Sequence, residues 1–145
     1  MEVRKIRESD LPELTRLMVA VYNAPPWNNQ WTEETASESL ATLLSFPTFY
    51  GNVIVDDQKI FGAIMGHLRK YSSETTYYID ELFVAIEHRR QGVAKCLYER
   101  TITDLQQMGV QGAFFTSLRD TPAYHFYIKL GAWDLTDSAC FYHKF

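Results

Sequence analysis

Residues 80–99 decide how the chain is organised, and they read DELFVAIEHRRQGVAKCLYE. Residues 82–84 end a run that favours a β-strand, and apolar residues recur at helical spacing from Val93 onward. Between the two runs the sequence is basic and contains Gly92, a residue type common in tight turns. The stretch therefore predicts a strand, a turn and the start of a helix.

A turn of this kind is suited to bind an anion. The first amides of a helix lack acceptors within the helix and lie at the positive end of its dipole. Gly92 has no side chain to keep a ligand away from these amides, and Ala94 leaves the next position nearly bare. Arg89, Arg90 and Lys95 add positive charge. We expect a pyrophosphate site here, although the spacing matches neither a Walker loop nor a three-glycine dinucleotide fingerprint.

Two segments of the sequence resemble motifs of the GNAT N-acetyltransferase superfamily. Residues 89–94, RRQGVA, resemble the family's Q/R-x-x-G-x-G/A motif. Residues 123–132, AYHFYIKLGA, resemble the A-x-x-F-Y-x-K-x-G-F segment that many members carry after the fifth strand, although Ala132 replaces the usual aromatic residue. Because the motifs occur in the family's order, the resemblance covers essentially the whole chain.

The resemblance implies a fold and a co-substrate. It implies one α/β domain over residues 1–145, with a mixed, mostly antiparallel sheet of six to seven strands, splayed between the fourth and fifth strands and flanked by about four helices. It also implies acetyl-CoA as co-substrate and no metal. The implied acetyl-CoA-binding residues are Leu82, Phe83, Val84, Arg89, Arg90, Gln91, Gly92, Val93, Ala94, Lys95 and Tyr127.

Hydrophobic periodicity and turn residues place the elements along the chain. Gly62 and Gly66 lie within an expected strand and predict bulges or a close backbone neighbour. The expected strands cover residues 3–6, 50–55, 59–68, 75–84, 112–118 and 139–145, and the expected helices cover residues 10–22, 32–45, 93–108 and 122–130.

Tyr127 is the candidate general acid. In the family, the matching tyrosine protonates the departing thiolate of CoA. The chemistry is suitable because a phenol with a pKa of about 10 stays protonated at neutral pH. The alternative is that Tyr127 packs against the sheet and its hydroxyl bonds elsewhere.

A carboxylate near the acceptor can remove the proton from an attacking amine. Asp80 and Glu81 are adjacent on an expected strand, so their side chains should point to opposite faces and only one should face the acceptor. Asp80 matches an acidic position in some aminoglycoside 6′-N-acetyltransferases and is ranked first. The alternative is a solvated or salt-bridged pair. His67 could face the same cavity, but a lone histidine is more often structural and receives no catalytic role.

The acceptor is expected beside Tyr22, Trp27, Trp31 and Asp80. Both tryptophans belong to a proline-containing segment, residues 23–31, which breaks the helical pattern. Aromatic residues on such a loop line a binding site or form a hydrophobic plug between helices, and the sequence favours neither reading.

Composition limits the class of protein. The 145 residues are 46% hydrophobic and 22% charged, as expected for one globular domain. No apolar run is long enough to span a membrane, and no signal peptide is visible at the start, so we expect a cytoplasmic protein. The net charge of −4 argues against a nucleic-acid partner and is compatible with a cationic acceptor.

The resemblance extends loosely to aminoglycoside 6′-N-acetyltransferases. It implies direct transfer of an acetyl group to a primary amine of a small molecule, possibly an amino sugar. Alternatives are a peptide or protein N-terminal amine, a polyamine, or a non-catalytic acyl-CoA sensor. A homodimer also remains open.

Overall fold

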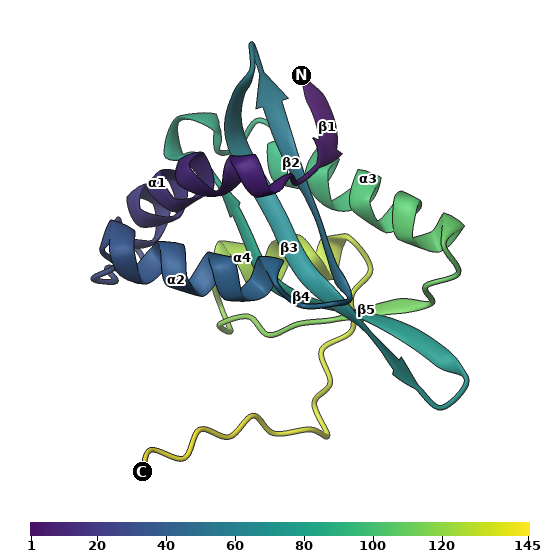
Figure 1. Cartoon of the computed structure of the whole chain (residues 1–145). Helices are drawn as coiled ribbons and strands as arrows, with labels where there is room; N and C mark the ends of the chain where they lie inside the picture. The colour runs from purple at the N-terminus through teal and green to yellow at the C-terminus, as the bar shows by residue number, and fades with distance from the viewer. The chain divides into compact units, whose positions relative to one another are not determined.

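A five-stranded sheet forms the centre of the first part of the chain (Figure 1). This computed structural model describes residues 1–145, which form two compact units, residues 1–115 and 116–145. The strands lie in the order of the sequence: β1 (Glu2–Lys5), β2 (Phe49–Asp56), β3 (Lys59–Tyr71), β4 (Glu74–Val84) and β5 (Gly112–Phe114). Only the β4–β5 pair is parallel, so the predicted mixed and mostly antiparallel sheet is confirmed.

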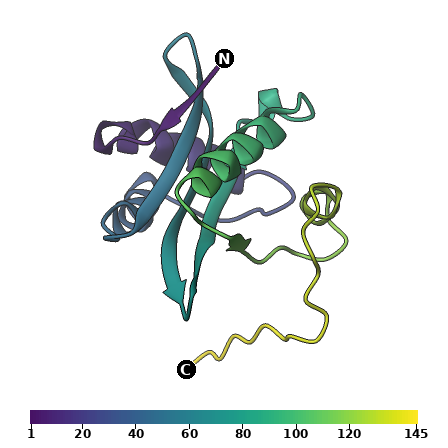
Figure 2. The same ribbon diagram turned by 90° about the vertical axis from the view of Figure 1, so that its right-hand side faces the viewer.

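The chain has four helices, as predicted. They are α1 (Leu11–Tyr22), α2 (Glu33–Leu44), α3 (Val93–Gln107) and α4 (Pro122–Lys129), and two short 3₁₀ turns cover Glu8–Asp10 and Ile86–His88. Helices α1 and α2 bury their apolar residues on one face of the sheet, and α3 covers the other (Figures 1 and 2). None of the helices has both the length and the apolar character needed to cross a bilayer.

The predicted count of six to seven strands is wrong, because the structure has five. Residues 139–145 alternate apolar and polar side chains, but alternation makes a strand only where a neighbouring strand accepts the backbone hydrogen bonds. These residues pair with no strand, and Phe141, Tyr142 and Phe145 are exposed. β5 also ends at Phe114, before the predicted limit at residue 118.

Helices α2 and α3 begin in different ways. Helix α2 follows Thr32, whose side-chain oxygen accepts a 3.0 Å hydrogen bond from the Thr35 amide, as an N-cap residue should. Helix α3 follows Gly92 and has neither a side-chain cap nor an acidic residue in its first turn. Its first amides are therefore left for another acceptor.

Two glycines of β3 mark bulges, as predicted. Between β3 and β4, Met65 pairs with Glu81 and Gly66 pairs with Ile79, so Asp80 has no residue opposite it. A Cβ atom on Gly66 would lie 2.1 Å from the carbonyl oxygen of Tyr78, so only glycine fits at this position. The register of β2 and β3 also shifts beside Gly62, and there the residue without a partner, Phe61, lies on β3 itself.

Candidate active site

The bulge at Asp80 changes which side chains share a face of β4. Ile79 and Leu82, three residues apart, both pack on the α3 face, whereas strict alternation would put them on opposite faces. The two residues between them, Asp80 and Glu81, both reach the α1–α2 face. The prediction that they point to opposite faces is wrong, because the extra residue interrupts the alternation.

Asp80 is held by His67 of β3. The His67 Nδ1 atom lies 2.7 Å from an Asp80 carboxylate oxygen, and both side chains are about a quarter exposed, at 26% and 28%. His67 lies two residues after Met65, a member of the core beneath α1 and α2. The pair therefore lies on the α1–α2 face and remains open to solvent.

Glu81 is held by α1. The Tyr22 hydroxyl donates a 2.7 Å hydrogen bond to a Glu81 carboxylate oxygen. Burial raises the pKa of the Glu81 carboxyl, and the negative charge of Asp80 adds to the rise, while the bond from Tyr22 opposes it. Two adjacent carboxyl groups thus have different surroundings: Glu81 is partly buried, and Asp80 is more exposed.

The two tryptophans of the segment 23–31 differ in placement. Trp31 packs against the core, and its backbone exchanges two 2.8 Å hydrogen bonds with the Asn23 side chain. Trp27 is 38% exposed and meets the Tyr22 ring edge to face, with ring centres 5.3 Å apart. Trp31 therefore has the contacts of a plug, and Trp27 is the tryptophan accessible to a ligand.

Arg89 joins this aromatic region to the turn before α3. Its guanidinium carbon lies 5.4 Å from the centre of the Trp27 ring, within the range of a cation–π contact. Its Nη2 atom is buried without a hydrogen-bond partner, as is Nδ1 of the neighbouring His88. Buried polar atoms are rarely left unpaired, so these two positions point to a ligand with acceptor and donor groups. His88 was not among the residues predicted to bind the ligand, although its place directly before Arg89 puts it at the edge of the predicted turn.

The turn itself presents unpaired amides. Gly92 has a φ of 75°, and the first helical hydrogen bond runs from the Cys96 amide to the Gly92 carbonyl, at 2.9 Å. The amides of residues 93–95 consequently lack acceptors within α3. A Cβ atom on Gly92 would meet nothing within 4 Å, so open space lies beside the turn at this residue. Together with Arg89, the turn fits the diphosphate of the implied acetyl-CoA.

The edge of β4 is open where the pantetheine arm was expected. β5 pairs with β4 only at residues 76–78, so no strand lies on that side of residues 79–84. Phe83 and Val84 are buried, which leaves their backbone rather than their side chains for contact with a ligand.

Tyr127 lies on α4, in the second unit. Thr121 caps this helix by accepting a 3.2 Å hydrogen bond from the Tyr124 amide. Tyr127 is partly buried, and its ring centre lies 5.2 Å from that of Phe126. Three residues earlier, the Tyr124 hydroxyl donates a 2.8 Å hydrogen bond to Asp134.

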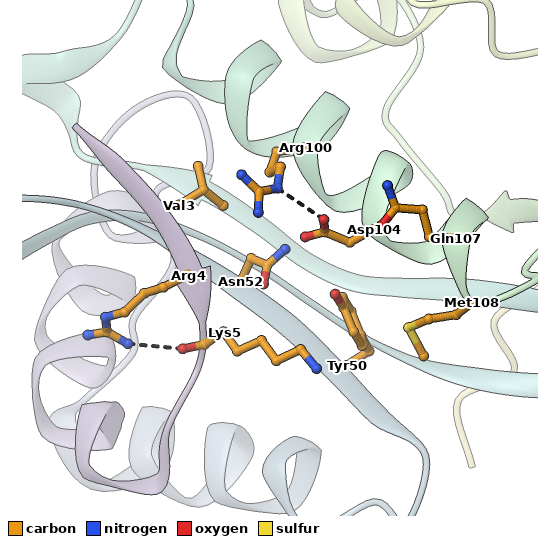
Figure 3. Close-up of a pocket in the computed structure, with 9 residues that line it drawn as sticks. All are labelled: Val3, Arg4, Lys5, Tyr50, Asn52, Arg100, Asp104, Gln107 and Met108. Carbon is orange, nitrogen blue, oxygen red and sulfur yellow. Dashed lines mark hydrogen bonds and ion pairs between the residues drawn. The ribbon is translucent and has the colours of Figure 1, made fainter.

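A separate hollow of about 330 Å³ lies on the α3 face, lined by residues of β1, β2 and α3 (Figure 3). Two of its polar side chains bond each other, Arg100 and Asp104 at 3.0 Å, and buried Asn52 donates a 2.9 Å hydrogen bond to Thr101. None of the sequence-predicted site residues lines it, and Asp80 and Glu81 lie on the opposite face of the sheet.

Solved structures share this fold. One is an aminoglycoside acetyltransferase, meta-AAC0020, from an uncultured soil metagenomic sample, solved in complex with sisomicin. It is 26% identical to this chain, with a TM-score of 0.77, and the match covers 99% of this chain and 95% of that chain. The apo 6′-N-acetyltransferase AAC(6′)-IG from Acinetobacter haemolyticus is 16% identical, with a TM-score of 0.75 and coverages of 100% and 99%. A ribosomal-protein-alanine N-acetyltransferase from Brucella melitensis biovar Abortus is 15% identical, with a TM-score of 0.78 over 100% of both chains.

The sequence also matches a family model. No curated protein matches the chain. The model described as the acetyltransferase (GNAT) family matches residues 11–132, which include the turn before α3, both carboxylates and Tyr127. The chain therefore belongs to the GNAT acetyltransferase family and is an acetyl-CoA-dependent acyltransferase.

Proposed function

We propose that the protein moves an acetyl group from acetyl-CoA directly to a primary amine of a small molecule, with amino sugars as the favoured class. Two adjacent carboxyl groups beside an exposed aromatic residue carry this proposal. Asp80 and Glu81 lie on one face, and Tyr22 links Glu81 to Trp27. Such a surface suits a polycationic acceptor that also has apolar ring faces.

Sequence identity supports the choice of acceptor class. The solved aminoglycoside acetyltransferase is 26% identical over nearly the whole of both chains, whereas the ribosomal-protein-alanine enzyme is 15% identical. Their TM-scores, 0.77 and 0.78, do not separate the two classes. A protein or peptide N-terminal amine therefore remains the second candidate, followed by a polyamine.

In the proposed reaction, acetyl-CoA supplies the activated acetyl group, and the chain binds it at two places. The unpaired amides of residues 93–95, together with Arg89, bind the diphosphate. The open backbone edge of residues 82–84 binds the pantetheine arm. The role proposed for Gly92 is to let the diphosphate approach those amides.

Proton transfer completes the proposal. Asp80 is the first candidate to remove the proton of the amine, because its side chain is accessible, and the partly buried Glu81 is the second. Tyr127 is proposed to protonate the departing thiolate, as a neutral phenol can at physiological pH.

A thiol-release assay tests the proposal. The protein is mixed with acetyl-CoA and, in separate reactions, amino sugars, polyamines and peptides with a free N-terminus, and each product is identified by mass spectrometry. We expect thiol release that depends on the amino sugar and yields its N-acetyl derivative. Acetylation of peptides or polyamines alone would contradict the acceptor class. Binding of acetyl-CoA without release with any amine would support a non-catalytic sensor.

A further inference from the structure

The pair formed by His67 and Asp80 has a geometry that the proposed function does not use. One ring nitrogen, Nδ1, lies 2.7 Å from the carboxylate. When a neutral imidazole donates Nδ1–H to a carboxylate, its proton is fixed on Nδ1, and the lone pair is left on Nε2. The carboxylate thereby selects the tautomer in which Nε2 can accept a proton.

The His67 ring is held by neighbours on two sides. It stacks on the Tyr78 ring with centres 5.3 Å apart and planes 13° apart. Phe46, which follows α2, meets it edge to face at 5.2 Å. These contacts and the bond to Asp80 limit rotation of the ring, so the direction of Nε2 is set before any ligand binds.

Nε2 itself remains available. It makes no hydrogen bond within the chain, and it is not among the polar atoms sealed from solvent without a partner. The side chain is 26% exposed. Asp80 lies in the bulge, two residues beyond the last β4 residue that pairs with β5. The pair of His67 and Asp80 therefore lies where β4 and β5 part.

We propose that His67 is the catalytic base of this acetyltransferase, and that Asp80 is the positioning residue that holds His67. The inference rests on the proposed function and changes the role of Asp80 within it. A neutral imidazole that keeps its lone pair on Nε2 can take a proton directly from an amine nitrogen.

The proton balance is simple. As the nitrogen of the neutral amine forms its bond to the acetyl carbonyl carbon, Nε2 takes a proton from that nitrogen. The C–S bond then breaks, and the electron pair leaves with the CoA thiolate. The thiolate takes a proton from the general acid, and the imidazolium returns its proton to solvent.

The charged and titratable groups around His67 come mainly from β4. They are Asp80, which bonds the ring, and Tyr78, which stacks on it; Glu81 follows Asp80 in the chain and bonds Tyr22 of α1. Phe46 is the contact from the end of α2 and carries no charge. Of these neighbours, only Asp80 bonds the imidazole, so its removal should affect His67 most.

The first test is spectroscopic and needs no amine. Nitrogen-15 NMR of the imidazole side chains reports the tautomer of each neutral histidine. We expect His67 as the Nδ1–H form in the wild type and a shift toward the Nε2–H form in Asp80→Asn. An Nε2–H form in the wild type would overturn the proposal. Because the measurement does not depend on turnover, it judges the pair even if the acceptor class is wrong.

The second test is kinetic and uses whichever amine is acetylated. His67→Gln and Asp80→Asn should each lower kcat on the order of 100-fold, and the double variant should be no slower than the slower single variant, because the two residues act as one unit. The pH profile of kcat/KM should lose one ionisation in His67→Gln. His143→Gln, in the exposed C-terminal segment, is the control and should keep wild-type kcat.

Two kinetic results would overturn the inference. One is a His67→Gln variant that keeps wild-type kcat and pH profile while Asp80→Asn is slow, since Asp80 would then be the base itself. The other is a double variant whose losses multiply, because independent contributions are not expected from a single proton-accepting pair. Thermal unfolding of each variant separates loss of function from loss of fold.

Discussion

The Tyr22 hydroxyl donates a 2.7 Å hydrogen bond to the Glu81 carboxylate, across 59 positions of sequence. Tyr22 ends α1, and Glu81 follows the bulge of β4. The bond ties the helix that leads into the Trp27 segment to the strand that carries the site. The partly buried Glu81 is the chain neighbour of Asp80, whose bond to His67 remains accessible to solvent.

The partial burial of Glu81 predicts that this residue lowers the stability of the protein as pH rises. Its pKa is raised in the folded protein, so the folded state binds this proton more tightly than the unfolded state does. The free energy of unfolding must then fall as pH rises from the ordinary glutamate pKa through the raised one. Glu81→Gln should remove this fall and gain stability relative to the wild type as pH rises.

Urea unfolding at a series of pH values measures this difference. The control is Glu38→Gln, because Glu38 is exposed on α2. A constant difference between Glu81→Gln and the wild type at all pH values would show that burial does not perturb Glu81.

Gly66→Ala should destabilise the protein by about 2–4 kcal/mol, because the added methyl group would overlap the Tyr78 carbonyl oxygen. Gly112→Ala is the matched control, since a Cβ atom on Gly112 meets nothing within 4 Å. Chemical denaturation of both variants checks the difference. Equal stability of the two would mean that the β3–β4 bulge is not as tight as described.

The sequence allows much of this arrangement to be predicted, because local chemistry determines it. Gly92 and the basic residues before it predict the turn at the start of α3, and Gly66 predicts a bulge. The predicted faces of Asp80 and Glu81 are wrong because of this bulge. Gly66 of β3 predicts a bulge, but the extra residue, Asp80, lies on the partner strand β4. Which strand of a pair carries the extra residue depends on the register between the two strands, and the sequence of one strand does not determine that register.

Long-range contacts were beyond prediction from the sequence. Nothing near Tyr22 indicates a bond to Glu81, and a lone histidine such as His67 has no local signal for a carboxylate partner. The prediction of a final strand over residues 139–145 is wrong because alternating side chains do not supply a neighbouring strand to pair with.

Tyr127→Phe should lower kcat by about 100-fold or more and leave the Kd of acetyl-CoA unchanged, because only the proton donor is lost. Tyr124→Phe is the control on the same helix; its hydroxyl bonds Asp134, and kcat should stay near the wild-type value. Steady-state kinetics with calorimetry of binding checks both. Equal rates for the two variants would remove Tyr127 from the proton-transfer role.

Arg89→Met should weaken CoA binding by about 10-fold or more, because Arg89 has a buried Nη2 atom without a partner. Lys95→Met should have a smaller effect, since Lys95 is exposed and its Nζ atom lies 3.9 Å from the Glu99 Oε1 atom. Arg89→Lys should not restore binding, because an ammonium group lacks the planar fork of a guanidinium. Titration calorimetry at two salt concentrations compares the three. A larger loss in Lys95→Met would reverse the assigned roles.

We propose that the turn from Arg89 to Ala94 binds the diphosphate of acetyl-CoA. The Kd of CoA for a matched pair of glycine variants tests this most directly. Gly92 and Gly109 have similar positive φ values, 75° and 86°, and a Cβ atom meets nothing within 4 Å at either. Gly92→Glu and Gly109→Glu therefore carry a similar backbone strain and the same charge at opposite ends of α3. We predict a Kd weakened on the order of 100-fold or more for Gly92→Glu, and a wild-type Kd for Gly109→Glu. An unchanged Kd in a folded Gly92→Glu protein would contradict the account.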